Sequence, residues 1–536
     1  MEAIRLIMSG AVVGQELAAE FGPLPPSLLP VGVRRLYELQ AEALRPSKKK
    51  KAAQNLWLVL PETFALSPYD GAWLAEAGIQ VLQIPTGLTL GEAIVYALNS
   101  IGVGDTPLHI LHGDTLIDAP PLDALDVIVT AERPNDYSWA EAEIDEDGRI
   151  RSLATVSAGE RGQGRPVVAG YFALGSSLEF LRALTRMRGD FIGALNHYLA
   201  VRPVTAETAR NWLDFGHLQT FFQSRLAVTT ARGFNNLVVD GVTVRKSSRD
   251  KLKMWAEASW YQAVPMEVQI YSARLLDVGS DGDVGYYQTQ YEYLPVLSEL
   301  FVFGALGQQS WVRVLAHCED FLRCCAGLHR TDPPDLDLRT FTAGKTTERL
   351  QEFARQSGFD IDQPLTYAGQ PCPSLSAMAE RLAQITPTER DRPAAIVHGD
   401  FCFSNILYDS RTRRIRVIDP RGLIGGKASI YGDLRYDLAK LAHSIVGRYD
   451  QIVAGRYRVQ AAGTDYSLQF EDNPAQAWLQ AGLGDLVVDG CNGLDPAVRA
   501  VMTGLFLSML PLHADRPDRQ QAFLANAMRL FLELDR

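Results

Sequence analysis

The 536-residue sequence contains no long apolar segment and no regular cysteine pattern. A helix that spans a bilayer needs roughly 18 or more consecutive apolar residues, and no run in this chain is that long. Its six cysteines show no Cys-x-x-Cys spacing, which argues against a zinc site and a disulfide framework. The N-terminus also lacks the basic and apolar regions of a secretion signal. We therefore expect a soluble cytoplasmic protein with no membrane partner.

Basic residues are scarce relative to acidic ones. The formal net charge is −11, which argues against nucleic acid or an anionic membrane as a partner. The basic run Lys48–Lys51 is short and follows Pro46 and Ser47, so we interpret it as a solvated loop. The hydrophobic content of 47% is typical of a globular protein, and the length predicts at least two domains. The sequence does not indicate an oligomeric state.

The stretch with the most chemical information lies between Ile396 and Gly422. An apolar strand precedes His398-Gly399-Asp400, Asn405 follows five residues after Asp400, and a second apolar strand leads to Asp419. In a phosphoryl-transfer site one carboxylate orients the attacking hydroxyl and accepts its proton, while an amide and a second carboxylate bind Mg²⁺. Asp400, Asn405 and Asp419 fit these three roles in that order. A single Asp after a strand is usually a turn or cap residue, but the joint pattern favours catalysis.

This stretch resembles the aminoglycoside phosphotransferase and choline kinase family, whose members phosphorylate small hydroxyl compounds. As in that family, Gly399 stands where protein kinases have an Arg. The resemblance implies a bilobal, protein-kinase-like α+β fold with ATP and Mg²⁺ as cofactors, and it makes His398 a further catalytic candidate. Residues 432–439 also resemble the helix behind the family's site, although Asp433 is equally well explained as a helix N-cap.

A predicted hairpin lies upstream, in residues 234–246. The Asp240-Gly241 pair between two β-rich runs is a strong hairpin signal and places Lys246 at the end of a strand. Kinases need a lysine on the nucleotide phosphates and a helical glutamate that holds it, and Glu257 lies in the helical stretch that follows. A surface strand is the more common position for a lysine, but the order of these elements favours the catalytic role. The usual Gly-x-Gly-x-x-Gly loop is missing, with residues 232–236 in its place.

The kinase-like half divides into a small lobe, about 229–298, and a large lobe, about 299–536. Glu292 and Leu294 end a predicted strand, where the resemblance implies a hinge that hydrogen-bonds adenine through its backbone. The large lobe is largely helical by periodicity, and residues 364–373 are predicted to form a loop because of their prolines.

Residues 1–228 alternate short apolar strands with helical segments. This alternation predicts an α/β domain with a mostly parallel sheet and helices on both faces, in which ligands bind at the carboxyl ends of the strands. The first strand leads into a turn that contains Gly10 and Gly14, whose backbone amides can approach a phosphate. Asp114 and Asp214 lie at the ends of two later strands, where two carboxylates can hold one divalent cation against a triphosphate.

These landmarks resemble the sugar-phosphate nucleotidyltransferase family over nearly all of the first 220 residues. The resemblance implies a Rossmann-like fold, a Gly-rich turn on the nucleotide, and metal binding by Asp114 and by Asp214 of the Asp-x-Gly motif. Residues 139–153 also resemble the exposed hairpin of that family. A second NTP, which is CTP, UTP or GTP, is the implied co-substrate.

The basic residues of that family are missing from this sequence. Gln15 and Glu16 stand near the place of its Arg, and Ser27 stands where its lysine is expected. Nucleotidyl transfer requires positive charge on the phosphates as pyrophosphate leaves. The available replacements are Lys48–Lys51, Arg34-Arg35, Arg161 and Arg165.

The two halves together predict a bifunctional enzyme. It would phosphorylate a small hydroxyl compound, with a sugar as first choice, and couple the phosphate to an NTP to give an activated precursor for a surface polysaccharide or lipid. One alternative is a kinase with a degenerate, regulatory N-terminal domain. Another is a choline- or polyol-type kinase and cytidylyltransferase, although the scattered tryptophans do not indicate an aromatic cage for choline. An inactive binding module is disfavoured because the kinase residues are all present.

Overall fold

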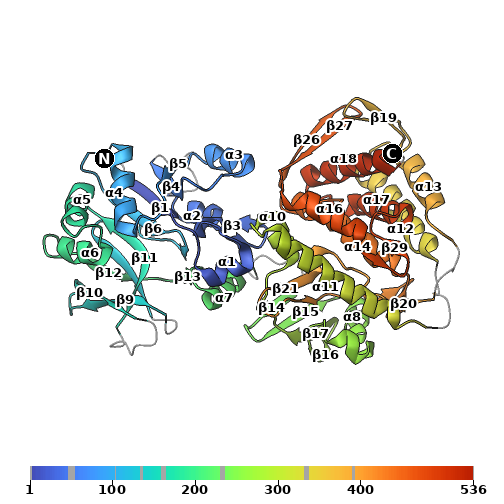
Figure 1. The fold of residues 1–536 in the computed structure, drawn as a ribbon, viewed down its shortest axis with the longest axis horizontal. Helices are drawn as coiled ribbons and strands as arrows, with labels where there is room; N and C mark the ends of the chain where they lie inside the picture. Colours follow the sequence, from blue (N-terminus) through green and yellow to red (C-terminus); the bar gives the residue numbers. More distant parts are fainter. Residues whose placement is uncertain are drawn as a thin grey trace. The chain divides into compact units, whose positions relative to one another are not determined.

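The computed structural model describes residues 3–45, 55–102, 104–132, 137–157, 165–229, 236–330, 337–388 and 393–534. The chain divides into two compact units, residues 1–228 and residues 229–536 (Figure 1). Within the described ranges, no helix combines the length and the apolar character that a bilayer crossing requires.

The N-terminal unit is organised around one large sheet. In the described part its strands are β1 (Ile4–Met8), β4 (Leu56–Pro61), β5 (Gln80–Ile84), β6 (Leu108–His112), β8 (Val127–Ala131), β9 (Trp139–Ile144), β10 (Ile150–Val156), β11 (Val167–Leu174) and β12 (Thr205–Thr208). Strands β6, β1, β4 and β5 are parallel neighbours in that order. Strand β11 runs antiparallel to β6, and β9 and β10 continue the antiparallel side. The predicted α/β class is confirmed, with a sheet that is parallel on one side and mixed on the other.

Helices cover both faces of this sheet. Successive side chains of a strand point to opposite faces, so Leu6 of β1 belongs to one hydrophobic cluster and Ile7 to the other. The first cluster is closed by α4 (Leu90–Ile101), which begins with a Thr89/Glu92 capping box. The second is closed by α2 (Leu36–Ala43) and α3 (Pro68–Glu76). The carboxyl ends of β1 and β6 lead into the loops that carry the predicted site residues.

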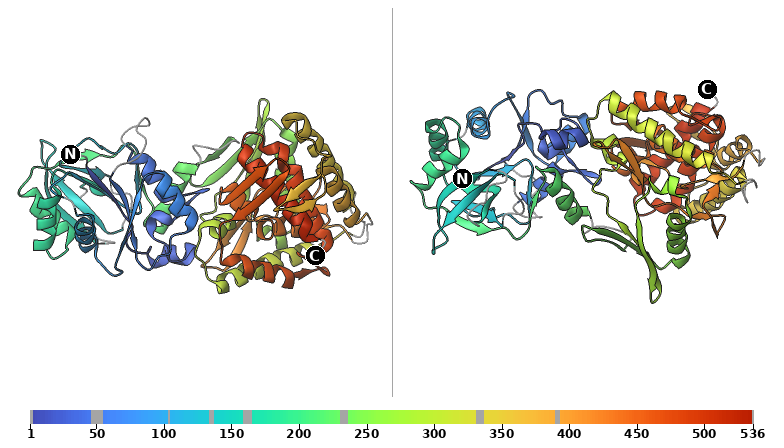
Figure 2. Two further views of the ribbon diagram at one scale, coloured as in Figure 1. Left: turned by 90° about the horizontal axis from the view of Figure 1, so that it is seen from above. Right: turned by 60° about the horizontal axis from the view of Figure 1, so that its bottom comes forward.

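The small lobe of the C-terminal unit is an antiparallel sheet with one long helix. Its strands, in the order β14, β15, β17, β16, are Asn236–Val239, Thr243–Ser248, Val284–Gln290 and Leu275–Asp281, and the helix is α8 (Lys251–Ala263). Gly241 has a φ of 86°, a left-handed conformation that glycine adopts without strain. The predicted Asp-Gly hairpin is therefore confirmed. Figure 2 shows these green strands beside the orange and red elements of the large lobe.

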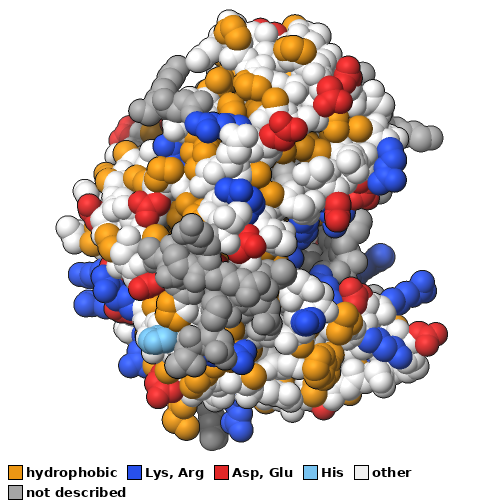
Figure 3. Space-filling model, turned by 90° about the vertical axis from the view of Figure 1, so that its right-hand side faces the viewer, with side chains coloured by type: hydrophobic (Ala, Val, Ile, Leu, Met, Phe, Trp, Pro, Cys, Tyr) orange, Lys and Arg blue, Asp and Glu red, His pale blue; other side chains and the backbone are white. Residues whose placement is uncertain are grey.

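The large lobe is mostly helical. Its long helices in the described ranges include α11 (Gln308–Gly327), α12 (Leu338–Ser357), α13 (Leu375–Ile385), α14 (Arg435–Ile445), α16 (Ala475–Asp485), α17 (Pro496–Met509) and α18 (Pro517–Leu534). Side chains of basic, acidic and hydrophobic type are interspersed on the face of the molecule in Figure 3.

The large lobe also contains a four-stranded sheet that corrects one prediction. Strands β18 (Leu365–Tyr367) and β19 (Gln370–Cys372) form a hairpin where a loop was expected, and β18 pairs with β27 (Asp465–Phe470). The connecting Ala368-Gly369 has φ values of 49° and 77°, the geometry of a tight hairpin turn. Each of these strands has three residues, which is too short to show the alternation of polar and apolar side chains that predicts a strand, and β19 also contains a proline.

Candidate active sites

A buried carboxylate fixes the loop that carries the kinase candidates. Asp437 of α14 accepts hydrogen bonds from the backbone amides of His398 (2.7 Å) and Gly399 (2.8 Å). Burial raises the pKa of Asp437 to about 7, although the two hydrogen bonds act in the opposite direction. Gly399 has a φ of 79°, which permits the sharp turn into Asp400. The helix therefore holds the loop from beneath.

His398 differs from its predicted place among the catalytic residues. Its side chain is completely buried, with its ring edge-on to those of Trp260 and Phe401. Burial lowers the pKa of His398 to about 4, so the imidazole is neutral near pH 7. The backbone amide of Asp400 donates to its Nδ1 at 3.3 Å. A side chain so enclosed cannot contact a substrate, and we assign it a positioning role.

Asp400 lies in a polar environment at the end of this loop. The Lys440 ammonium of α14 lies 2.7 Å from its Oδ1. The Asn405 amide donates to both its Oδ2 and its carbonyl oxygen at 2.9 Å. Burial opposes ionisation, but Lys440, His398 and Arg421 outweigh it and lower the pKa of Asp400 to about 2. The carboxylate is therefore ionised throughout the physiological range and can accept a hydrogen bond from a substrate hydroxyl.

A short hairpin brings Asn405 next to Asp419. Strands β21 (Ile406–Asp409) and β22 (Arg414–Val417) pair, and the backbone amide of Ile418 donates to the carbonyl of Asn405 at 3.0 Å. Asp419 has a φ of 56°, a strained conformation that is common at functional sites. Since the Asn405 amide nitrogen donates to Asp400, the amide oxygen is the atom that remains available for a metal ion. Asn405 and Asp419 thus offer the oxygen ligands that Mg²⁺ prefers.

Lys246 and Glu257 form a buried ion pair at 2.8 Å between β15 and α8. Burial lowers the pKa of Lys246, but Asp419 and Glu257 raise it to a larger extent. Tyr287 of β17 donates to Glu257 at 3.0 Å and lies 3.0 Å from Asp419 Oδ1. The sequence analysis did not identify Tyr287. Its position opposite Lys246 in the register of β15 and β17 is the signal that could have found it.

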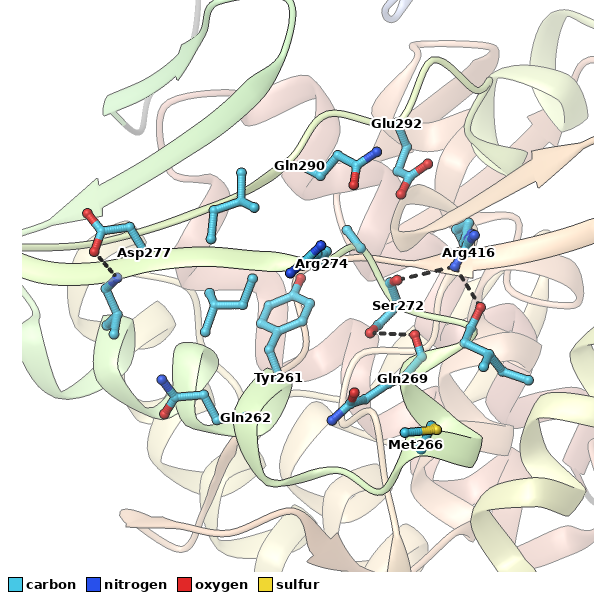
Figure 4. A pocket seen from close by; sticks show the side chains of 15 residues that line it. Tyr261, Gln262, Met266, Gln269, Ser272, Arg274, Asp277, Gln290, Glu292 and Arg416 are labelled. Carbon is cyan, nitrogen blue, oxygen red and sulfur yellow. Dashed lines mark hydrogen bonds between the residues drawn. The ribbon is translucent and has the colours of Figure 1, made fainter.

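The predicted hinge residues are bonded to each other. The backbone amide of Leu294 donates to the carbonyl of Glu292 at 2.8 Å, so an adenine ring would have to replace this bond. The Glu292 side chain instead faces a cavity of about 860 Å³, together with Arg274 and Gln290 (Figure 4). Neither Lys246 nor Asp400 lines this cavity. The role of the hinge in adenine binding stays a prediction.

In the N-terminal unit, Asp114 and Asp214 converge on one glycine. Strand β13 (Trp212–Asp214) pairs antiparallel with β7 (Thr115–Ile117), and the backbone amide of Phe215 donates to the Asp114 carbonyl at 2.8 Å. A Cβ at Gly216 would overlap the Asp114 carboxylate and would lie 3.3 Å from Asp214 Oδ1. The two carboxylates therefore share one small space.

The electrostatics of this pair suit a cation. Burial raises the pKa of Asp114, and Asp214 raises it further. Asp214 is held by the Thr220 hydroxyl and by His217, whose Nδ1 lies 2.9 Å away. Burial lowers the pKa of His217, but Asp214 and other acidic groups raise it overall. No three His, Cys, Asp or Glu side chains gather as a metal site in the described ranges, so water or phosphate oxygens would complete the coordination.

The predicted replacement cations of this unit have other partners. Arg35 donates to the carbonyl of Leu28 at 2.7 Å and lies 3.5 Å from Asp70. Arg34 pairs with Glu38 and Glu42, and Arg165 pairs with Glu143. Lys48–Lys51 and Arg161 lie outside the described residues, as does most of the 232–236 stretch. Arg34, Arg35 and Arg165 are therefore engaged by acidic groups of their own unit.

Ser27 joins the two loops at the strand ends. It is fully buried, its amide donates to Ser9 Oγ, and its hydroxyl donates to the Gly113 carbonyl, each at 3.0 Å. Gly10 has a packing explanation, because a Cβ there would overlap Ile84. Gly14 precedes α1 (Gln15–Phe21) and has open space around it. Only Gly14 keeps room for the predicted approach to a phosphate.

Aromatic side chains gather beside Asp214, which the sequence did not indicate. Tyr137 stacks on His217 with ring centroids 4.1 Å apart, and Trp139 lies 5.3 Å from the same ring. Trp139 and Trp212 meet at 5.0 Å. Tyr137 and Trp139 are far from Trp212 and His217 in the sequence, and only the fold brings these rings together. Because the rings pack on each other, they do not form an open cage.

Residues 241–470 match the model of the phosphotransferase enzyme family. This match confirms the predicted resemblance of the C-terminal half and the prediction of an enzyme. A comparison with curated protein sequences gives no match.

Solved structures are similar to parts of the chain. The CTP:phosphocholine cytidylyltransferase of Streptococcus pneumoniae is 10% identical, with a TM-score of 0.34 over 42% of this chain and 98% of that one. The UTP-bound UGPase of Acinetobacter baumannii is 14% identical, with a TM-score of 0.31 over 44% and 95%. A thermostable mutant of aminoglycoside phosphotransferase APH(4)-Ia with ADP and hygromycin B is 15% identical, with a TM-score of 0.35 over 55% and 88%.

Proposed function

We propose that the C-terminal unit is a kinase that transfers the γ-phosphoryl group of ATP to a hydroxyl of a small molecule. Asp400 orients the hydroxyl and accepts its proton, and Lys246, held by Glu257, binds the nucleotide phosphates. Asn405 and Asp419 would hold Mg²⁺, which would neutralise charge on the transferred group. The observation that carries the proposal is the ionised Asp400 within hydrogen-bonding distance of Asn405 and Lys440.

We infer that the N-terminal unit is a nucleotidyltransferase. The support is the convergence of Asp114 and Asp214 on Gly216, which leaves two carboxylates facing one space. Together they would hold Mg²⁺ on CTP, UTP or GTP while a sugar phosphate displaces pyrophosphate. The product of the two reactions would be a nucleotide-activated sugar for a surface polysaccharide or lipid. Because both reactions use nucleotides, we place the protein in the cytoplasm.

A second candidate function is a kinase with a regulatory N-terminal unit. The observation in its favour is that Ser27, Arg34 and Arg35 are all engaged in contacts within the fold. A transferase without free cations near its phosphates would stabilise the leaving pyrophosphate poorly. Such a unit would still bind a nucleotide.

Pyrophosphate release distinguishes the two functions. The purified full-length protein is incubated with Mg²⁺, ATP, one of CTP, UTP or GTP, and a panel of free sugars, sugar acids, polyols and choline. Release that requires both ATP and one particular NTP is expected for the bifunctional enzyme. ADP formation without pyrophosphate, for an acceptor that is clearly phosphorylated, would identify the kinase with a regulatory unit.

A further inference from the structure

Two helices of the large lobe present matching faces beside Asp400. On α12 the face carries Phe341 and, four residues later, Lys345; on α14 it carries Tyr436 and, four residues later, Lys440. Residues four apart lie on the same side of a helix. The Phe341 and Tyr436 rings meet edge-on with centroids 5.0 Å apart. The two helices therefore approach each other at these rings, and on each helix a lysine follows one turn after the aromatic residue.

Arg421 enters the same region from the loop after Asp419. A Cβ at Gly399 would lie 2.7 Å from the Arg421 Cβ, so the glycine in the catalytic loop makes room for the arginine. The guanidinium donates to the Tyr436 hydroxyl at 2.9 Å and lies 5.0 Å from the Phe341 ring centroid. Neutral groups thus hold this arginine, and Asp400, whose pKa it helps to lower, is already paired with Lys440.

Three cationic side chains, Lys440, Arg421 and Lys345, interact electrostatically with Asp400. Lys440 is neutralised by Asp400 at 2.7 Å, whereas neither Lys345 nor Arg421 forms an ion pair with any described residue. Lys345 is solvent-exposed, yet partial burial and the neighbouring Arg421, Lys440 and Arg349 lower its pKa to about 8, whereas Asp400 acts to raise it. Lys345 and Arg421 therefore share Asp400 with Lys440, and neither has a described carboxylate of its own within ion-pair distance.

We propose that the hydroxyl compound phosphorylated at Asp400 carries its own negative charge, a carboxylate or a phosphate monoester, which Lys345 and Arg421 bind. This inference rests on the proposed kinase function. Guanidinium and ammonium groups form strong charge-assisted hydrogen bonds with both kinds of anion. A cationic acceptor such as an amino sugar or choline would meet like charge at this place, which disfavours its binding. The class that fits is a sugar acid or a sugar phosphate.

A charge series of acceptors tests the inference on the full-length protein. ADP formation is measured for glucose, glucosamine, glucuronate and glucose 6-phosphate, and for the same series built on galactose and mannose. In at least one series kcat/KM is expected to be about ten-fold or more higher for an anionic member than for the neutral and amino members. The uronate and the 6-phosphate distinguish a carboxylate from a phosphate. A neutral or amino sugar as the best acceptor overturns the inference and leaves the kinase function standing, whereas no ADP formation with any compound overturns both.

Variants then distinguish acceptor binding from ATP binding. Lys345→Ala and Arg421→Ala are expected to raise KM for the anionic acceptor about ten-fold, with KM for ATP nearly unchanged, and Lys345→Arg is expected to restore binding. Arg349→Ala is the matched control, because Arg349 lies one turn further along α12 and pairs with Glu352 at 2.9 Å. An increase in KM for ATP instead of the acceptor would assign these cations to the nucleotide and would refute the inference.

Discussion

Tyr287 connects the lysine side of the kinase site to its metal side. Its hydroxyl lies 3.0 Å from Glu257 and 3.0 Å from Asp419, and burial with these neighbours keeps the phenol neutral. A hydroxyl has only one hydrogen, so Tyr287 can donate to one of the two carboxylates at a time. The Lys246 ammonium, 2.8 Å from Glu257 and 3.2 Å from Asp419, donates to both. This single side chain therefore helps to set the distance between Glu257 and Asp419.

The hydroxyl of Tyr287 is expected to affect catalysis more than stability. Tyr287→Phe leaves two carboxylates short of a donor, so kcat for phosphorylation should fall about ten-fold, while the free energy of unfolding changes by about 1 kcal/mol. Tyr286→Phe is the control, since its exposed hydroxyl bonds Asp277 at 3.0 Å on the other face of the strand. Equal losses of kcat in the two variants would show that the Tyr287 bridge has no catalytic importance.

Gly216 has a comparable importance in the N-terminal unit. A Cβ at this residue would overlap the Asp114 carboxylate, so Gly216→Ala should separate Asp114 from Asp214 and reduce nucleotidyl transfer about 100-fold or more. Kinase activity should be unchanged. Gly104→Ala in the same unit has no atom within 4 Å of the added Cβ and should be silent in both assays. Full nucleotidyl transfer by Gly216→Ala would refute the proposal that the two carboxylates act together.

At the scale of elements, α14 couples the fold of the large lobe to the catalytic loop through Asp437. The pKa of this buried carboxyl is raised to about 7, above its value of about 4 in the unfolded chain. The folded protein therefore binds this proton more tightly, and its contribution to stability is full below about pH 4 and is lost as the pH rises toward 7. Asp450, whose pKa is also raised to about 7 by burial, adds to the same slope.

Phosphorylation should show the opposite trend with pH. Ionised Asp437 accepts from the amides of both His398 and Gly399, whereas the protonated form loses acceptor strength. We expect kcat to decline as the pH falls below about 7. Asp437→Asn should lower kcat about 100-fold and remove this pH dependence, because its NH₂ group faces a backbone donor. A wild-type kcat that does not vary between about pH 6 and 8 would exclude Asp437 as the titrating group.

The strands, loops and helix of the kinase site could be predicted from local sequence, whereas contacts between residues far apart in the sequence could not. The Asp-Gly turn predicts the hairpin that carries Lys246, and strand-loop-strand spacing predicts the order of Asp400, Asn405 and Asp419. Lys440 and Arg421 reach Asp400 only through the packing of α14 and the turn after Asp419. Such contacts leave no periodic signal in the sequence.

Contacts between distant residues also explain why the roles of some residues in the N-terminal unit could not be predicted. The sequence predicted Asp114 and Asp214 at strand ends. It also suggested Arg34 and Arg35 as cations for the phosphates, but in the fold they pair with Glu42 and Asp70. The sequence contains these acidic residues without showing which cation each one meets. Burial likewise decides the role of His398, because a histidine before a glycine and an aspartate is equally compatible with an exposed or an enclosed ring.

At the scale of the whole molecule, the two proposed sites belong to different compact units and should fail independently. Asp400→Asn replaces the proton acceptor by an amide and leaves Lys440 without a carboxylate, so phosphorylation should fall about 10³-fold. Nucleotidyl transfer to a supplied sugar phosphate should remain. Asp114→Ala should show the reverse pattern, because it removes one of the two carboxylates that face Gly216.

The two reactions run in sequence test the independence of the two sites more stringently. Each variant alone should release no pyrophosphate from ATP, an NTP and the free acceptor, since one of the two steps is missing. A mixture of the two variants should restore release, because the phosphorylated intermediate made by Asp114→Ala can diffuse to the intact N-terminal site of Asp400→Asn. Unfolding curves that match the wild type establish that both variants are folded. If one substitution in a folded protein removed both partial reactions, the phosphate-transfer and nucleotide-transfer chemistry would have to share a single site, and the proposal of two separate sites would be wrong.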